Sequence, residues 1–130
     1  MTAELRILAW SILLGLVHVI VAATMATRQR GLGWNASNRD GDARPLTGAA
    51  ARAGRANRNF LETFPFFAAA ALAVVAAKSG TAHTALGAQA YFWARAAYLP
   101  IYIVGIPYLR TLVWAVSIWG LLQLIWALFV

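Results

Sequence analysis

The stretch LRILAWSILLGLVHVIVAATM, residues 5–25, decides the fold class of the chain. The only charges in it or next to it are Glu4 and Arg6, which lie at its outer end. An α-helix needs about 20 mostly apolar residues to cross a bilayer. Residues 5–25 are therefore predicted to form a membrane-spanning helix.

A cleaved signal peptide is the alternative for this segment, since residues 22–26 include small side chains. Signal peptides, however, have apolar runs of roughly 7–15 residues and a clear positive excess before them. Here the run is longer, and Glu4 offsets Arg6. We expect the segment to remain in the mature protein.

Three further segments, about residues 55–77, 82–105 and 109–130, are also long and mostly apolar. They lack the alternation of membrane β-strands and exceed the roughly ten residues of such strands. Because backbone polar groups in lipid must be satisfied within their own segment, helices are expected. The predicted fold is an all-α integral membrane protein, a four-transmembrane-helix bundle with residues 1–130 as one domain.

The composition narrows the classes of function. Hydrophobic residues make up 62% of the 130-residue chain and charged residues 12%, which leaves no room for an added soluble catalytic domain. Cysteine is absent, which excludes disulfides, thiolate metal sites and iron–sulfur clusters. With His18 and His83 as the only histidines, no metal is expected.

Positive charge is concentrated in the connector at about residues 26–54 and just after it. Seven of the eleven Lys and Arg residues lie there: Arg28, Arg30, Arg39, Arg44, Arg52, Arg55 and Arg58. By the positive-inside rule the connector faces the cytoplasm and both termini face the opposite side. Each arginine of the connector could bind a ligand. The alternative is that it only sets the orientation of the chain in the membrane and attracts anionic lipid headgroups. No nucleic-acid partner is indicated.

Polar residues enter the second predicted helix along one face. Arg55, Arg58, Asn59 and Glu62 lie at positions i, i+3, i+4 and i+7, which share a helix face. Such residues inside a membrane usually face a bundle interior or a watery cavity and pair there. Glu62 is the strongest single candidate for function, and a structural ion pair with Arg55 or Arg58 is the alternative.

The third predicted helix has a similar face formed by Arg95, Tyr98 and Tyr102, and Arg110 follows at the start of the fourth. For the tyrosines, an interfacial aromatic belt is the alternative. Together the two faces hold guanidinium groups, one carboxylate, a carboxamide and phenols. This set suits a small zwitterion with excess negative charge, because arginines bind carboxylates and a glutamate binds an ammonium group.

Residues 55–66, RANRNFLETFPF, closely resemble the signature of the MAPEG family, the membrane-associated proteins in eicosanoid and glutathione metabolism. The signature reads R-A-x-x-N-x-x-E, followed by P-F. The series Arg95, Tyr98, Tyr102 and Arg110 is similar to the family's pattern on its third and fourth helices. Tyr98 stands where some members have histidine, and Thr111 where some have serine after the last arginine.

The resemblance implies a homotrimer that holds glutathione between neighbouring subunits. It assigns Arg55, Asn59 and Glu62, with Arg58 beside them, to one side of the glutathione site. Arg95, Tyr98 and Tyr102 would complete the site from the adjacent subunit, and Arg28 would match an arginine at the end of the first helix. Arg110 would lie near the sulfur as the catalytic residue, because a neighbouring cation favours the thiolate.

The predicted function is that of a membrane-bound glutathione transferase or peroxidase of detoxification type, with lipophilic small molecules as substrates and glutathione as co-substrate. The alternatives are a thiol- or lipid-binding membrane scaffold without turnover and a small proton-coupled transporter. The two arginines beside Glu62 count against a transporter, because they stabilise the charged carboxylate rather than a proton-carrying one. The chain is expected to be a bacterial member of the family, in the inner membrane.

Overall fold

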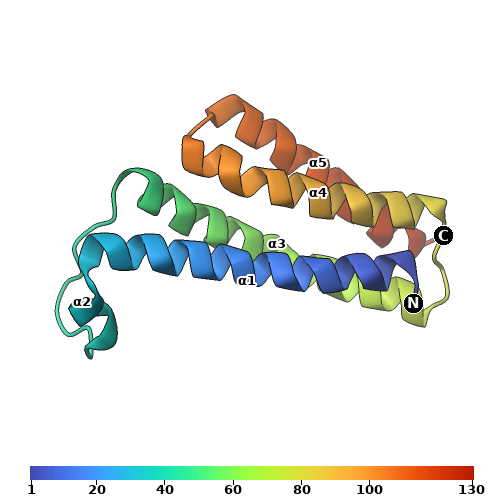
Figure 1. Ribbon diagram of the computed structural model, residues 1–130. Coiled ribbons are helices and arrows are strands. Elements are labelled where there is room, and N and C mark those ends of the chain that lie inside the picture. Colours follow the sequence, from blue (N-terminus) through green and yellow to red (C-terminus); the bar gives the residue numbers. More distant parts are fainter.

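Five helices make up the computed structural model, which describes all 130 residues (Figure 1). They are α1 (Ala3–Arg30), α2 (Leu32–Ala36), α3 (Gly48–Ala76), α4 (Ala82–Val104) and α5 (Pro107–Ala127). Three of them, α1, α3 and α5, are long and apolar enough to cross a membrane. The helix α4 has 23 residues but is too polar to meet that description.

The four long helices form two antiparallel pairs. α1 packs along α3, and α4 packs along α5, while α3 and α4 join the pairs and α1 and α5 do not touch. The pairs diverge toward the end of the bundle that carries α2, where α3 begins and α4 turns into α5 (Figure 1). Both chain termini lie at the other end.

Several polar residues of α4 face the inside of the bundle, whereas His83 and Gln89 are exposed. Tyr91, Arg95 and Tyr98 are all buried against the other helices, and Tyr91 stacks on Phe67 of α3 with ring centroids 4.1 Å apart. The apolar core joins all four long helices around Phe60, Phe67 and Leu124. Part of the low hydropathy of α4 thus comes from side chains that are covered by protein.

Many large apolar side chains instead face outward. Only 25 of the 130 residues are buried, and large side chains such as Leu16, Ile20, Leu112 and Trp119 are exposed on the long helices. An outer surface this apolar fits a lipid environment and contacts with other subunits. Together with the three apolar helices, this describes a multi-pass membrane protein.

The basic connector is shorter than predicted. α1 continues to Arg30 instead of ending near residue 25, and α3 begins at Gly48 instead of residue 55. The added turns are rich in alanine and arginine, which are strong helix formers even though arginine lowers hydropathy. Gly31, with φ of 91°, ends α1, and Arg28 and Arg30 lie in its last turn, where positive charge is favourable.

The turn between α4 and α5 follows from three neighbouring residues. Gly105 ends α4 in the left-handed conformation, with φ of 93°, and Pro107 begins α5. Proline is well tolerated at the first position of a helix and glycine just past the end of one. α5 therefore starts two residues before its predicted start at residue 109, which places Arg110 within its first turn.

Candidate functional site

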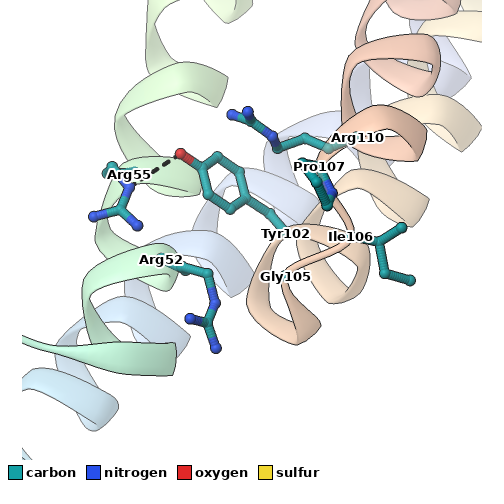
Figure 2. A pocket seen from close by; sticks show the side chains of 7 residues that line it. All are labelled: Arg52, Arg55, Tyr102, Gly105, Ile106, Pro107 and Arg110. Atoms are coloured by element: carbon teal, nitrogen blue, oxygen red, sulfur yellow. Dashed lines mark hydrogen bonds between the residues drawn. The ribbon is translucent and has the colours of Figure 1, made fainter.

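A pocket of about 300 Å³ opens where the two helix pairs diverge. α3 supplies Arg52 and Arg55, and the turn from α4 to α5 supplies the rest of the lining: Tyr102, Gly105, Ile106, Pro107 and Arg110 (Figure 2). Three guanidinium groups thus surround a space that no carboxylate lines. We call this space the arginine pocket.

Tyr102 is the centre of the arginine pocket. Its hydroxyl points across to α3 and accepts a hydrogen bond from Nε of Arg55 at 3.1 Å (Figure 2). The guanidinium carbon of Arg110 lies 4.6 Å from the centroid of the same ring. Because both contacts leave guanidinium nitrogens unoccupied, the two arginines are held in place while they keep donors for an anion.

A smaller space of about 130 Å³ adjoins the arginine pocket through Arg110. Asn59, Tyr98, Thr111 and Trp114 form the remainder of its lining. Tyr98 and Tyr102 meet edge to face with ring centroids 5.4 Å apart, so the two tyrosines form a continuous wall. Asn59 from the predicted polar face of α3 and Tyr98 from that of α4 are thereby brought together.

Arg95 is fully buried, with 0% exposure, and lines neither space. Its Nη1 donates a hydrogen bond to Oδ1 of Asn59 at 2.8 Å, and its guanidinium carbon lies 4.3 Å from the centroid of the Tyr98 ring. Nε and Nη2 have no protein partner. In this arrangement Arg95 holds two lining residues in place rather than facing the pocket itself.

Within a single chain the two predicted polar faces already meet, and the division of the site between subunits that the resemblance implies stays a prediction. Arg55 meets Tyr102, and Asn59 meets Arg95, within one chain. The reason is that α3 and α4 pack directly against each other after a short turn, so their polar faces meet inside a single bundle. Residues of both predicted faces are therefore in contact inside one bundle.

Three of the predicted ligand residues lie outside both spaces. Arg58 and Glu62 are exposed on α3, and Arg28 is exposed in the last turn of α1. None of the three lines the arginine pocket or the smaller space beside it. None of the three forms a hydrogen bond with another predicted site residue, although Glu62 lies near enough to Arg95 for their charges to interact.

Sequence reasoning missed Arg52 as a site residue. Its Nε donates to the backbone oxygen of Ile103 at 2.8 Å, which ties the start of α3 to the end of α4 beside the pocket. Arg52 lies three residues before Arg55, on the same helix face. That spacing would have revealed it if the helix had been predicted to begin at Gly48.

Comparison with known families gives one match. The profile of the MAPEG family matches residues 7–130, nearly the whole chain. The chain belongs to the MAPEG family. The prediction from residues 55–66 is confirmed, and MAPEG membership supports a membrane role related to glutathione or eicosanoid metabolism. MAPEG proteins include glutathione transferases and peroxidases as well as members that are not enzymes.

No curated protein and no solved structure matches this MAPEG chain. Its geometry therefore has to be interpreted from its own residues. No group of three or more His, Cys, Asp or Glu side chains comes together in it.

Proposed function

We propose that the chain is a membrane-bound, glutathione-dependent transferase or peroxidase that conjugates or reduces lipophilic electrophiles. The observation that supports this most is the arginine pocket, in which Arg52, Arg55 and Arg110 surround a space without a carboxylate. Glutathione carries two carboxylates and one ammonium group, so its excess negative charge complements this lining. Planar guanidinium groups also bind carboxylates through paired hydrogen bonds.

In this proposal the binding contacts come mainly from α3 and α4. Arg52 and Arg55 bind a carboxylate of glutathione, and Tyr102 donates its hydroxyl hydrogen to the same group. Asn59 and Tyr98, both held by Arg95, contact the peptide part from the smaller space. The asparagine amide can both donate and accept, as a peptide group requires.

Arg110 has the proposed catalytic role. It is the residue that lines both spaces, so a thiol placed between them lies beside its guanidinium group. A positive charge there stabilises the thiolate and the charge that develops when it attacks a carbon or a peroxide oxygen. The Thr111 hydroxyl lines the same smaller space and is available as a donor.

The proposed assembly is a homotrimer of four-span subunits, in which α4 is the fourth span. The homotrimer is supported by the exposure of Arg58 and Glu62 on α3, since α3 is long and apolar enough to cross a membrane. A charged side chain at the centre of a span costs about 2.5–3.5 kcal/mol on insertion scales, so such groups usually face protein or water. A neighbouring subunit would cover these residues, and its Arg28 would add a further cation.

For location, we propose a bacterial inner membrane with the connector between α1 and α3 on the cytoplasmic side. Support comes from the arginines at that end of the bundle and the positive-inside rule. The arginine pocket then opens at the cytoplasmic end, where soluble glutathione is available. Lipophilic substrates would arrive through the bilayer.

The test is a pair of measurements on protein purified in detergent. Glutathione binding is followed by calorimetry, and conjugation by the absorbance of a generic aryl electrophile. Binding with turnover supports the enzyme. Binding without turnover of aryl electrophiles or lipid peroxides favours the scaffold, a role compatible with the non-enzymatic members of the family. Absence of glutathione binding contradicts the enzyme and a thiol-binding scaffold, and favours a scaffold that binds lipid.

A further inference from the structure

A separate pocket of about 410 Å³ lies between α1 and α4, at the opposite end of the bundle from the arginine pocket. Its lining consists of Arg6, Ile7 and Trp10 from α1 and Gln89, Phe92 and Trp93 from α4. None of these residues lines the arginine pocket or the space beside it. We call it the α1–α4 pocket.

The position of the α1–α4 pocket is fixed by a contact between two helix starts. Thr84, near the start of α4, donates its hydroxyl hydrogen to Oε1 of Glu4 in the first turn of α1 at 2.5 Å. On α1 the pocket begins within one turn of this contact, at Arg6, and on α4 its lining runs from Gln89 to Trp93, up to the middle of that helix. At about 1.5 Å per residue, Arg6 lies only a few ångströms from the end of the span.

Donors predominate among the polar groups of the pocket. Nε1 of Trp93 donates to Oε1 of Gln89 at 3.0 Å, which uses one lone pair of the amide oxygen and leaves the amide nitrogen of Gln89 as a donor. The second polar residue is Arg6, whose guanidinium group has donors and no acceptor. The lining is thus complementary to an anion.

Arg6 also lacks an acidic partner from its own chain. The chain has four acidic residues. Glu4 is directed into the bundle, where it is 4% exposed and bound to Thr84. Glu62 lies in the middle of α3, and Asp40 and Asp42 lie in the connector at the far end of the bundle. The positive charge of Arg6 is therefore available to a ligand.

The remaining wall is apolar and faces outward. Trp10 is 54% exposed and Trp93 is 64% exposed, on helices whose outer surfaces are apolar. Tryptophan is enriched where the headgroups of a bilayer meet the acyl chains, since its ring is apolar and its N–H is polar. A ligand that enters here comes from the bilayer, with an apolar part between the two indole rings and an anionic part at Arg6.

We propose that the α1–α4 pocket binds an anionic glycerophospholipid, with the phosphate at Arg6 and Gln89 and the upper acyl chain between Trp10 and Trp93. The pocket volume of about 410 Å³ suits a lipid headgroup and the part of an acyl chain next to it, so the rest of the lipid stays in the bilayer. The lipid belongs to the leaflet opposite the basic connector. This site is independent of glutathione binding, because it shares no residue with the arginine pocket.

The test is native mass spectrometry of the detergent-solubilised protein with phosphatidylglycerol or phosphatidylcholine of identical chains. Arg6→Gln is compared with Lys78→Gln, which removes an equal charge from an exposed residue at the same end, outside the pocket. We expect Arg6→Gln to lower the preference for phosphatidylglycerol about fivefold. Lys78→Gln should leave it within about twofold of the parent protein.

A second pair of variants tests the apolar wall. Trp10→Ala should reduce retention of both lipids, whereas Trp119→Ala, an exposed tryptophan on α5, should not. Equal lipid preference in Arg6→Gln and the parent protein overturns the proposal, and so does an equal loss in Arg6→Gln and Lys78→Gln. Dissociation of the oligomer by Trp10→Ala also overturns it, because the pocket would then be a contact between copies of the chain.

Discussion

At the scale of single residues, Tyr102 contacts Arg55 through its hydroxyl and Arg110 through its ring, and the hydroxyl contact can be removed without the ring contact. Tyr102→Phe deletes the hydrogen bond from Arg55 and keeps the ring beside Arg110. One net hydrogen bond contributes about 0.5–1.5 kcal/mol. We therefore expect glutathione affinity, measured by calorimetry, to fall about threefold to tenfold.

The matched control is Tyr108→Phe, which removes the same hydroxyl from a residue that is 89% exposed and outside the pocket. It should bind glutathione like the parent protein. Equal affinities in the Tyr102 variant and the parent would show that this hydroxyl does not contribute to the site.

Arg110 should affect rate more than affinity. In Arg110→Ala, Arg52 and Arg55 still bind carboxylates, but the thiolate loses its neighbouring cation. Loss of one such electrostatic group typically raises the barrier by about 2.7–4 kcal/mol, or roughly a hundredfold to a thousandfold in rate. Steady-state conjugation and the ultraviolet absorbance of bound thiolate at different pH values are the measurements. An unchanged rate with an unchanged thiolate signal would rule out this role.

Residue spacing alone could predict much of the lining of the two adjoining spaces. Asn59, Tyr98 and Arg110 were candidates because polar groups in a span need partners, and the structure does bring them together. The burial of Arg95 could not be predicted in this way. Helix spacing indicates a face, but whether a residue on that face opens on a pocket or lies beneath it depends on how deeply the neighbouring helix packs.

At the scale of helices, α4 and α5 cross in close contact at two glycines. A Cβ atom added to Gly87 would lie 2.6 Å from the backbone oxygen of Gly120. Because this oxygen belongs to the backbone, it cannot move aside as the end of a flexible side chain could. Small residues of this kind let helices approach closely in lipid. Gly87→Ala should therefore lower stability by about 1–3 kcal/mol, the usual cost of overpacking.

Thermal unfolding in detergent measures this effect, with Gly33→Ala as the control. Gly33 has no atom within 4 Å of an added Cβ, so that variant should unfold like the parent protein. If Gly87→Ala is as stable as Gly33→Ala, the close crossing of α4 and α5 is not needed for stability.

Hydropathy predicts the cores of the helices better than their ends. It places the middle of α1 and α3 correctly. The first predicted helix, however, ends before Arg28 and the second begins only at Arg55, because a hydropathy scale counts arginine as unfavourable. Helix formation itself tolerates arginine and alanine well. The turns missed at the start of α3 carry Arg52, so this error of a few residues removed a lining residue from the predicted site.

At the scale of the whole molecule, the exposed charges on α3 are the basis of a prediction about assembly. We expect native mass spectrometry in micelles to give the mass of three copies, because Arg58 and Glu62 would otherwise face lipid. Crosslinking at low protein concentration is the second measurement. A stable monomer that still binds glutathione would show that one chain provides a sufficient site.

The family and the membrane character were predictable for the whole chain, since both rest on short-range patterns: a motif in residues 55–66 and long apolar runs. The distribution of the site between subunits does not follow from such patterns. It depends on the packing of α3 against α4, and a pattern of polar faces is equally compatible with contacts inside one bundle or between two.

The central claim is that the arginine pocket binds glutathione. The most direct test is a calorimetric titration of the parent protein, Arg55→Ala and Lys78→Ala with glutathione, each checked for the same oligomeric mass. Hydrogen bonds to charged groups contribute about 1.5–3 kcal/mol, so Arg55→Ala should bind at least about tenfold more weakly. Lys78 lies outside the pocket, and its variant should bind like the parent. Equal affinity in all three proteins would contradict the account.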